Sequence, residues 1–533
     1  MVKILLLRYI FTMNKKIRFS GILLHPTSLP SAHGIGDLGD EARKFIDFLE
    51  KSSVGLWQIL PLGPVGFGNS PYAARSAFAG NELLISLDTL ADEGYLSISD
   101  TLEHPEFPES SVAFPQVESY KNPLLVKAAD KFLHSASKQE QTAFEDFCEQ
   151  QSDWLHDYAL YRALIDHYQD SRWFSEWAPE LTRRDPDAIK RWSQLKKTEI
   201  ARWKVLQYFF FKQFSALKQY ANAKNIAIVG DIPIFVAPDS VDAWSNRTYL
   251  KMDADGSFSA MSGVPPDAFS DTGQLWGNPV YDWDALEADG FSWWVRRLEH
   301  QFSLTDIVRI DHFRGFEAYW EVPAGHTTAE HGSWVKAPGE RLFSLLKERF
   351  PLLPVIAEDL GVITPEVEHL RDSNGFPGMK IAQFAFAKTG PGELDADNAY
   401  LPHNYIEQCV AYTGTHDNDT SRGWFEKLDD GMRDIVRRYL SCSDDGVVWH
   451  LMRAVMASSA HYAIVPMQDI LNLGSEARMN TPGTCGEPNW CWRVHEHALQ
   501  DESVAAIRSL VRPFGRVSGL QEVAEAMGGL SVT

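Results

Sequence analysis

The sequence predicts an α/β protein of the (β/α)8 type, a TIM barrel with large helical and loop insertions. Eight short apolar runs recur along the 533 residues and stop at polar residues, glycine or proline. The runs do not alternate between apolar and polar residues, which is typical of parallel strands buried on both faces. Helical patterns separate the runs, and eight strands that alternate with helices are what this barrel requires.

The eight predicted strands follow one another at uneven intervals. In chain order they are Gly21–His25, Leu56–Pro61, Ile226–Ile234, Ile307–Asp311, Val355–Glu358, Met379–Phe384, Val410–Thr415 and Tyr462–Met467. The order of strands within a sheet cannot be read from the sequence. A doubly wound sheet, which also alternates strands and helices, therefore stays open as an alternative.

Two of the predicted helices carry specific signals. Asp40–Glu50 places Phe45 and Leu49 four positions apart, so that both lie on one helical face, and the pattern stops before Gly55. Thr364 followed by Pro365 has the form of an N-cap with proline at the first helical position. We therefore expect helices after the first and the fifth strand.

The long interval between the second and third strands predicts a helical insertion. Pro61 and Ile226 are 165 positions apart, and the interval contains helical patterns such as Trp154–Asp166 and Trp192–Tyr220. A segment of this length with its own periodic pattern is more than a linker. We therefore interpret residues 90–220 as a mainly helical insertion into a catalytic barrel that spans residues 20–533.

A second insertion and an N-terminal extension complete the predicted organisation. Residues 239–304 follow the third strand and carry the turn signals Asp255-Gly256 and Pro265-Pro266, which predict a loop-rich insertion near the substrate site. Residues 1–19 are predicted to be an extension. Met13 precedes an ordinary polar segment, so translation starting there is an alternative to Met1.

Composition excludes several classes of protein. Lys and Arg total 50 against 72 Asp and Glu, a net charge of −22, which argues against nucleic-acid or anionic-membrane partners. No run approaches the length of a membrane-spanning helix. Five cysteines without a C-x-x-C pair indicate neither a disulfide framework nor a zinc site, and we interpret the chain as cytoplasmic. The 17 tryptophans offer flat apolar faces on which sugar rings stack, although most are expected in the core.

Acidic residues stand at the ends of several predicted strands, where a barrel places its chemistry. The third strand carries Asp231, the fourth ends in Asp311, the fifth ends in Glu358, and the seventh runs into His416 and Asp417. Any one of these acids could instead cap a helix or pair with arginine. Several acids converging on one barrel mouth favour a functional site, since charged residues are seldom fully buried unless paired.

Two of these carboxylates suit glycoside chemistry of the retaining type, which needs a nucleophile and a proton donor about 5–5.5 Å apart. Arg309 stands two residues before Asp311, on the same side of the strand, and would favour an ionised, nucleophilic Asp311. Glu358 has no basic residue within several positions, which suits a proton donor with a raised pKa. Asp417 beside His416 could stabilise the oxocarbenium-like charge. This chemistry needs no cofactor.

Three further motifs resemble other kinds of site. Gly34–Gly39 matches G-x-G-x-x-G, but it does not directly follow a strand and no acid follows at the end of the next strand, as a dinucleotide site requires. Asp253–Gly256 echoes a calcium loop, lacks its later acids, and is better explained as a hairpin turn. His312, His416 and Asp417 could ligate a metal, but they lack a paired-histidine spacing, so no metal is expected.

Through the acidic residues at the strand ends and the motifs around them, the sequence resembles the amylomaltases, the 4-α-glucanotransferases of the retaining α-amylase-like clan. The resemblance runs from about Gly21 to Arg493. One departure is Cys485–Pro488, placed where the family has glycine directly before the Asn489-Trp490 pair. The motifs that carry the resemblance are Pro30–Gly39, Asn69–Tyr72, Gly230–Val236, Val264–Asp267, Gly273–Pro279, Arg309–Gly315, Ala357–Gly361, Thr413–Asp417 and Met479–Thr484.

The resemblance implies a role for each matching residue. It implies Asp311 as nucleophile, Glu358 as acid/base and Asp417 as stabiliser of the transition state. Other matching residues are implied to bind the glucose units of donor or acceptor: Ser70, Tyr72, Asp231, Gln274, Trp276, Arg309 and His416. It also implies that no metal is needed and that a C-terminal β-sandwich is absent.

The implied activity is transfer of α-1,4-glucan segments from a maltooligosaccharide to the 4-hydroxyl of glucose or a maltodextrin. An amylase-type hydrolase using the same carboxylates is the alternative, since water could replace the acceptor sugar. A non-catalytic glucan-binding protein is a more remote alternative. Such a protein would bind sugars by stacking and hydrogen bonding alone, and it would not need the paired acid and nucleophile that this sequence carries. The sequence does not indicate an oligomeric state.

Overall fold

The computed structural model describes residues 18–253, 255–266, 270–350, 352–386, 388–390 and 393–517. The predicted extension, residues 1–19, lies outside this part except for Arg18 and Phe19, which begin the first strand, β1. The choice between Met1 and Met13 also lies outside the described residues.

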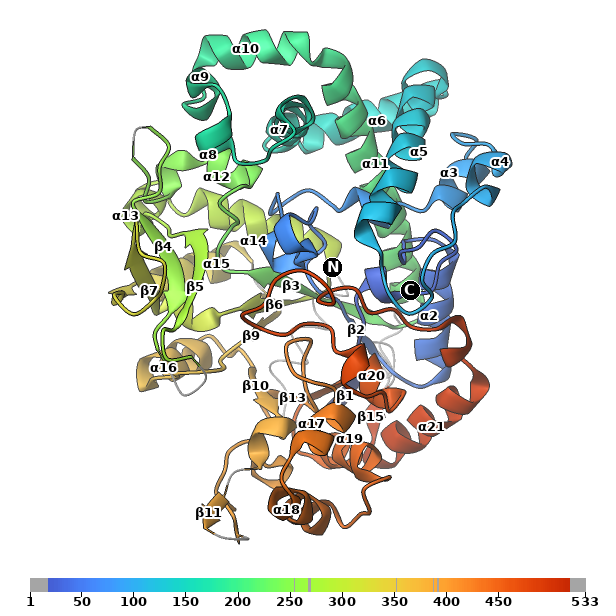
Figure 1. Ribbon diagram of the computed structural model, residues 1–533, viewed down its shortest axis with the longest axis vertical. Coiled ribbons are helices and arrows are strands. Elements are labelled where there is room, and N and C mark those ends of the chain that lie inside the picture. Colours follow the sequence, from blue (N-terminus) through green and yellow to red (C-terminus); the bar gives the residue numbers. More distant parts are fainter. Residues whose placement is uncertain are drawn as a thin grey trace.

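Eight parallel strands form the barrel at the centre of the molecule (Figure 1). Their order is β10-β13-β14-β1-β2-β3-β6-β9, and the Ala357 N–H donates to the Pro377 carbonyl over 3.0 Å, which joins the two ends of the path. The barrel prediction is confirmed, and the doubly wound alternative is wrong. The strands are β1 (Arg18–Leu23), β2 (Leu56–Gln58), β3 (Ala227–Pro233), β6 (Ile307–Asp311), β9 (Val355–Ala357), β10 (Gly378–Ile381), β13 (Cys409–Tyr412) and β14 (Tyr462–Pro466).

Each predicted strand has its counterpart, but most end earlier than the apolar run does. The run Met379–Phe384 leaves the ladder at Ile381 and continues as a 3-10 turn, Ala382–Ala385. Ala382 and Ala385 of this turn are fully buried, which explains apolar residues beyond the last ladder position, whereas Phe384 is exposed. The short strand β15 (Arg516–Val517) pairs with β1 on the outside of this path.

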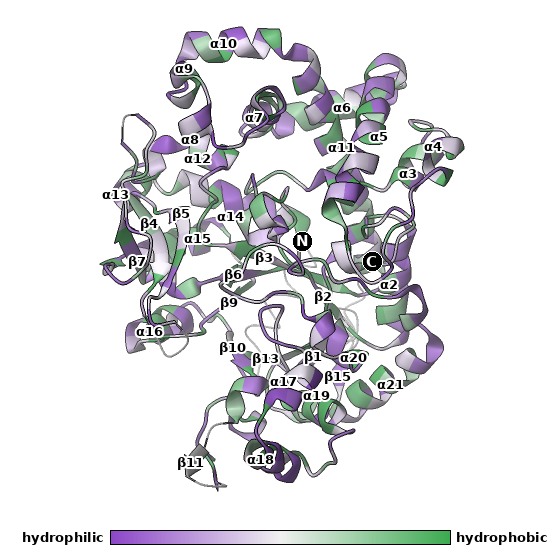
Figure 2. Ribbon diagram, in the orientation of Figure 1, coloured by the Kyte–Doolittle hydropathy of each residue, from purple (hydrophilic) through white to green (hydrophobic). Residues whose placement is uncertain are grey.

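Helices surround the barrel and show bands of hydrophilic and hydrophobic residues (Figure 2), as expected for helices with one buried face. The predicted helix α2 (Asp40–Lys51) buries Phe45 and Leu49 completely. Helix α16 (Pro365–Ser373) begins after Thr364 with proline at its first position, as predicted. The other helices here are α14 (Ser292–Leu304), α15 (Gly339–Arg349), α17 (Ser421–Lys427), α18 (Asp430–Leu440), α19 (Val447–Ala457), α20 (Met467–Ile470) and α21 (Asp501–Val511).

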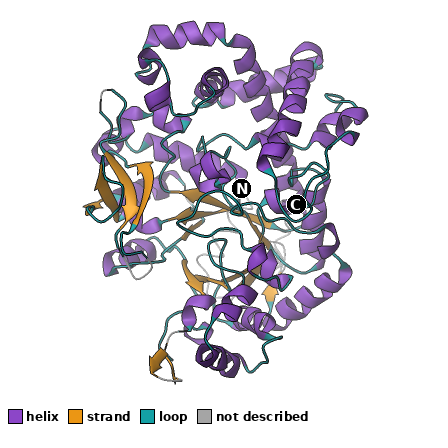
Figure 3. Cartoon of the chain, viewed as in Figure 1, coloured by secondary structure: helices purple, strands orange, loops and turns teal. Residues whose placement is uncertain are grey.

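A group of helices follows β2 and occupies the top of Figure 3. The helical pattern Trp192–Tyr220 is interrupted at Lys196, which separates α10 from α11. From its middle onward α11 packs on the barrel, where Phe209 and Phe210 share a core with Trp57 of β2. The group comprises α3 (Leu87–Asp92), α4 (Ile98–Leu102), α5 (Phe114–Ser135), α6 (Lys138–Gln150), α7 (Leu155–Tyr168), α8 (Trp173–Glu176), α9 (Pro179–Thr182), α10 (Pro186–Leu195) and α11 (Lys197–Ala223).

A four-stranded antiparallel sheet stands beside the barrel, at the left of Figure 3. Its order is β5-β4-β7-β8, so it combines two strands from before β6 with two from after it. Residues 239–304, expected to be rich in loops, contribute β4 and β5 together with α12 (Val241–Ser245) and α13 (Trp283–Ala288). The four strands are β4 (Ala260–Val264), β5 (Gln274–Pro279), β7 (Ala318–Pro323) and β8 (Ser333–Lys336).

Three smaller observations bear on the sequence predictions. Met252 and Phe258 form an antiparallel bridge around the turn at Gly256, so the calcium-like segment is a hairpin turn. All five cysteines lie in the described part and are free. No helix in that part is long and apolar enough to cross a membrane. A two-stranded ribbon, β11 (Lys388–Gly390) with β12 (Glu393–Leu394), completes the described fold.

Candidate active site

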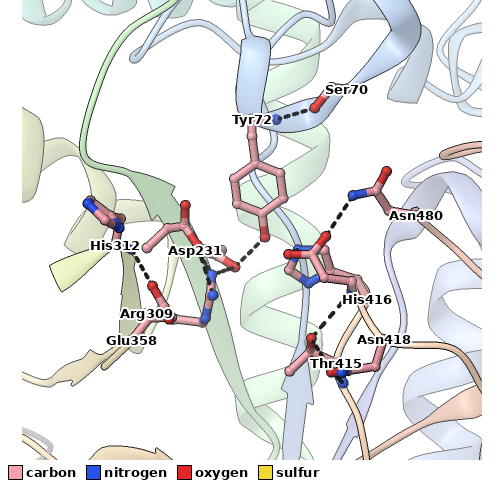
Figure 4. A network of polar contacts seen from close by, with 12 residues as sticks. Ser70, Tyr72, Asp231, Arg309, His312, Glu358, Thr415, His416, Asn418 and Asn480 are labelled. Atoms are coloured by element: carbon pink, nitrogen blue, oxygen red, sulfur yellow. Dashed lines mark hydrogen bonds and ion pairs between the residues drawn. The ribbon is translucent and has the colours of Figure 1, made fainter. Parts of the chain in front are cut away.

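The acidic residues predicted at the strand ends gather at one mouth of the barrel (Figure 4). Asp231 lies in β3, Asp311 ends β6, and Glu358 directly follows β9. His416 and Asp417 follow β13 in the turn before α17. Because all eight strands are parallel, their carboxyl ends meet at the same face, which is where this fold carries its active sites.

Arg309 connects two of these carboxylates. Its buried guanidinium donates from Nη1 to both oxygens of Asp231, over 2.8 and 2.7 Å, and from Nη2 to Asp311 Oδ1 over 2.8 Å. The first contact follows from the register of β3 and β6, which pairs Asp231 with Arg309. Burial opposes the charge of Arg309, but the carboxylates, Asp231 foremost, raise its pKa well above the usual value. Arg309 is therefore a permanent cation at the base of the site.

Asp311 is held with one oxygen on Arg309, while its side chain stays 29% exposed. Burial raises the pKa of Asp311 above its ordinary value, and the Arg309 charge opposes that rise. The sequence predicts that Arg309 favours the ionised form of Asp311, and the Arg309–Asp311 contact has this effect. It did not predict that burial outweighs the arginine, because the depth of a strand end in the barrel depends on the surrounding loops.

Glu358 accepts two backbone hydrogen bonds. The His312 N–H donates to Oε2 over 2.6 Å and the Leu360 N–H donates to Oε1 over 2.9 Å, which fixes the carboxyl plane. Burial first, and the negative charge of Asp311 second, raise the pKa of Glu358 to about 8. At neutral pH Glu358 therefore keeps its proton, which is the state that a proton donor beside a second carboxyl needs for acid/base work.

Asp417 is positioned from the opposite side of the mouth. The Asn480 amide donates to Asp417 Oδ1 over 2.7 Å, and Arg478 donates to the Asp417 carbonyl over 2.7 Å. His416 approaches Asp417 Oδ2 to 3.5 Å. The preceding turn is closed by Asn418, whose side-chain oxygen accepts from the Thr415 N–H over 2.9 Å. The Asp417 side chain remains 45% exposed, so it faces the open mouth.

Tyr72 links the two sides. Its hydroxyl donates to Asp231 Oδ2 over 2.8 Å, and its ring stacks on His416 with centroids 5.0 Å apart. Ser70 holds the tyrosine backbone, since its hydroxyl oxygen accepts from the Tyr72 N–H over 3.3 Å. Trp490 lies 5.8 Å from both the Tyr72 and the His416 ring. Tyr72, His416 and Trp490 therefore form an aromatic cluster beside the carboxylates.

Gln274 and Trp276 reach the site from β5, the edge strand of the four-stranded sheet. The Trp276 ring meets His312 edge to face, with centroids 4.7 Å apart, and its Nε1 donates to Gln274 Oε1 over 3.4 Å. Because the His312 backbone also binds Glu358, the Trp276 indole lies on the Glu358 side of the mouth. Asp267, the last residue of the Val264–Asp267 motif, lies outside the described residues.

The structure adds two residues whose roles the sequence did not indicate. The sequence offers His312 only as a metal ligand. In the structure its backbone adopts a left-handed φ of 51°, which directs the His312 N–H toward Glu358. Asn480 stood inside a motif without an assigned contact. In the described part of the chain, no cluster of three or more His, Cys, Asp or Glu side chains is arranged to hold a metal ion.

The outer loop that departs from the family pattern is closely tied to the site. The Asn489 side chain accepts from the Thr481 N–H over 2.9 Å, and the Trp490 N–H donates to the Met479 carbonyl over 2.7 Å. A β-carbon on Gly68, where φ is 72°, would lie 2.6 Å from the Cys485 sulfur. The loop around Cys485 therefore packs on the loop that leads to Tyr72.

Comparisons with known proteins identify the family of the chain. A sequence model of the 4-alpha-glucanotransferase family matches residues 24–500. The chain is 49% identical over 503 residues to 4-alpha-glucanotransferase from Synechocystis sp., covering 94% of this chain and 98% of the relative. The enzyme of the same name from Thermus thermophilus is 46% identical over 508 residues, covering 94% and 99%.

Solved structures give the same result. Amylomaltase from Streptococcus agalactiae in complex with acarbose matches with a TM-score of 0.90 at 38% identity, covering 94% of this chain and 100% of that chain. Amylomaltase from Corynebacterium glutamicum, at 18% identity and a TM-score of 0.75, shares the fold. Since the family model spans most of the chain and the relatives align over nearly their whole lengths, the chain belongs to the 4-α-glucanotransferase family.

Proposed function

We propose that this 4-α-glucanotransferase acts by retaining double displacement with Asp311 as nucleophile and Glu358 as acid/base. The observation that carries the proposal is the pairing of an Arg309-bound Asp311 with a Glu358 whose pKa is raised to about 8. Two carboxyl groups with opposite protonation at one barrel mouth are what retaining glycoside chemistry needs.

The first step breaks the bond between the anomeric carbon and the leaving oxygen. An Asp311 oxygen attacks the anomeric carbon of an α-1,4-linked glucose while Glu358 gives its proton to the leaving oxygen. The product is a β-linked glucosyl-enzyme and a shortened sugar with a free 4-hydroxyl. Asp417, held by Asn480, stabilises the positive charge that develops on the sugar ring.

The second step reverses the first with a new sugar. Glu358, now ionised, takes the proton from the 4-hydroxyl of an acceptor, whose oxygen attacks the anomeric carbon and releases Asp311. Two inversions restore the α-linkage. Maltooligosaccharides and glucose are the substrates in this proposal, and no resident metal or cofactor takes part in either step.

Substrate binding is assigned to the walls around the carboxylates. Tyr72 and His416 offer stacked rings beside the reacting sugar, and Asp231 is held by Tyr72 and Arg309 near its hydroxyls. On the Glu358 side, Trp276 offers a partly exposed indole to the acceptor, with Gln274 as its neighbour. Ser70 acts by holding Tyr72. We also propose a cytoplasmic location, since all five cysteines are free.

Incubation with maltotriose tests the proposal. Transfer yields glucose and longer maltodextrins with almost no net gain of reducing ends, because each broken linkage is replaced by a new one. Reducing ends that rise in step with glucose would identify an amylase-type hydrolase. If the protein binds maltodextrin but leaves maltotriose intact, the non-catalytic glucan-binding alternative holds instead.

A further inference from the structure

Two large aromatic residues stand out on the surface of the four-stranded sheet. In the described part of the chain, Trp276 and Trp334 are the tryptophans with exposed side chains, at 38% and 39% of the residue surface. They lie on the two opposite edge strands, β5 and β8. Trp276 belongs to the active site through His312, whereas Trp334 packs against Arg314 and Trp320. Exposed apolar surface of this kind often marks an interaction site.

Trp334 is held in one orientation. The guanidinium carbon of Arg314 lies 3.7 Å from the centre of its ring, and the ring of Trp320, its partner in the β7–β8 ladder, lies 5.2 Å away at 68°. Arg314 is itself buried and donates to the Val362 and Ala318 carbonyls. A flat apolar surface that is rigid before binding loses little side-chain entropy when a ligand stacks on it.

A cleft of about 620 Å³ opens between the β8–α15 connection and the start of α16. Lys336 lines it and stands two residues after Trp334, on the same face of β8. Helix α16 lies below the four-stranded sheet in Figure 1. The volume falls within the range of small-ligand sites. The cleft offers hydrogen-bonding side chains of both charges: Glu317, Lys336, Glu340, Arg341, Glu366 and His369.

The charges in this cleft favour a neutral, hydroxyl-rich ligand. Lys336 pairs with Glu317, and Arg341 pairs with Glu287 over 2.6 Å, so neither sign of charge dominates. Such a surface has no strong field for an ion, yet it has donors and acceptors for many hydroxyl groups. A stacking indole beside hydrogen-bonding groups is the combination that a sugar chain requires.

The position of the cleft connects it with the reaction centre. Val362, which is 57% exposed and accepts from Arg314, stands four residues after Glu358 in the same loop. Arg314 stands three residues after Asp311. Arg314, which stacks on Trp334, and Val362, which binds Arg314, thus lie in the loops that follow the two reacting carboxyls. The cleft is lined by the continuation of both loops, at Glu317 and at the start of α16.

We propose that Trp334 and the adjoining cleft form a second binding site for α-1,4-glucan chains, separate from the subsites at the carboxylates. It rests on the proposed function for the identity of its ligand. The site captures a long glucan on the flank of the barrel mouth and raises its local concentration at Glu358. Short substrates such as maltotriose are too short to occupy the reaction centre and this flank together.

Affinity electrophoresis in gels containing amylose tests the site on the full-length protein. All variants carry Asp311→Asn, which prevents turnover, and the gels contain excess maltotriose to occupy the reaction centre. Trp334→Ala is expected to raise the dissociation constant for amylose by about tenfold, the loss of one stacking surface. Ile406→Ala, which truncates another exposed apolar residue, is the matched control and keeps the parent mobility.

Lys336→Ala supplies a second, independent test, because its 73% exposed side chain contributes little to folding. It is expected to weaken retention by about threefold, the loss of one hydrogen bond, whereas Lys131→Ala on α5 does not. In variants that keep Asp311, the KM for amylose should rise several-fold more than the KM for maltotriose. Unchanged amylose retention in both folded variants overturns the site, and if Trp334→Ala fails to fold, Lys336→Ala decides alone. Failure of wild-type maltotriose transfer would overturn the proposed function instead.

Discussion

Arg309 shows how one side chain organises the chemistry of this site. Its two terminal nitrogens bind different carboxylates, Asp231 and Asp311, and the Arg309 side chain itself is buried. A lysine ammonium could not reproduce this geometry, because a planar guanidinium presents several donors in a fixed fork whereas an ammonium is a point charge. The fork leaves Asp311 Oδ2 without the arginine contact, and we assign the attack to that oxygen.

The protonation of the two carboxyls predicts a pH profile with two limbs. Glu358 must be protonated in the first step, and its pKa is raised to about 8, so kcat/KM falls as the pH rises through about 8. Asp311 must be ionised, and burial raises its pKa, so activity is lost on the acid side at a higher pH than an ordinary aspartate would set. The measurement is kcat/KM for maltotriose between pH 4 and 10.

The alkaline limb can be assigned with a modified enzyme and donor. A maltosyl fluoride needs no proton on its leaving group, so Glu358→Gln should react with it without the loss near pH 8. If the same alkaline limb persists in that variant, the limb belongs to another group and the acid role of Glu358 is wrong. Wild-type enzyme with the fluoride donor is the control.

The contact between Asn480 and Asp417 could not be predicted from the sequence. It stands 63 positions from Asp417 and donates to its carboxylate over 2.7 Å. The carboxylates could be predicted because acids at the ends of apolar strands have few structural uses. A neutral amide in an outer loop has many, so its contact had to come from the folded structure.

Asn480→Ala tests the support of Asp417. Hydrogen bonds to charged groups contribute about 1.5–3 kcal/mol, so kcat/KM for maltotriose should fall by about 10–100-fold. Asn480→Asp should be worse, because it places a like charge against Asp417. Asn404→Ala, which removes an amide bound only to backbone carbonyls, is the control. Wild-type kcat/KM in folded Asn480→Ala would remove Asn480 from this role.

At the scale of elements, the turn between β13 and α17 is held by a buried acid from the short helix that follows the next strand. Asp469, in α20 after β14, accepts from the Thr413 hydroxyl over 2.5 Å and from the Ser421 N–H and hydroxyl over 2.8 and 2.7 Å. Thr413 and Ser421 bracket the turn that contains His416 and Asp417. Asp469 is thus a positioning residue, which acts on the chemistry only through this turn.

Substitution of Asp469 should affect stability and activity together. Asp469→Ala leaves three buried donors without a partner and should cost about 3 kcal/mol, seen as a lower thermal unfolding temperature. Asp469→Asn keeps an acceptor for Ser421 and should retain most of the stability. A folded Asp469→Ala enzyme with wild-type KM and kcat would show that the turn holds its shape without Asp469.

The elements differ in how well the sequence predicts them. Barrel strands buried on both faces leave apolar runs, which is why all eight were found. Strands β4, β5, β7 and β8 are not predicted, because they are partly exposed and because β4 and β5 contain Gly263 and Gly277. In addition, β4 pairs with β7, which lies on the other side of Asp311 in the chain. Such pairing depends on the rest of the fold and leaves no local pattern.

At the scale of the whole molecule, the strands and helices of the barrel could be predicted from the sequence, but the closing of the strands into a barrel could not. Eight runs and their helices indicate an α/β fold, whereas the order of strands and the bond from Ala357 to Pro377 are properties of the assembled structure. The helices between β2 and β3 and the sheet beside β6 flank the same barrel (Figure 1). We therefore propose residues 90–220 and 239–304 as insertions into one catalytic barrel of residues 20–533.

The central claim is that Asp311 forms a covalent bond to the sugar while Glu358 moves the proton. Trapping the glycosyl-enzyme tests it most directly. In Glu358→Gln, a maltosyl fluoride can glycosylate Asp311, but no base remains to activate the acceptor, so the intermediate should accumulate. Mass spectrometry of the digested protein should then find the added maltosyl group on the peptide that contains Asp311, and Asp311→Asn/Glu358→Gln should lack it. A maltosyl group on a different residue, or fluoride release without any adduct, would contradict the account.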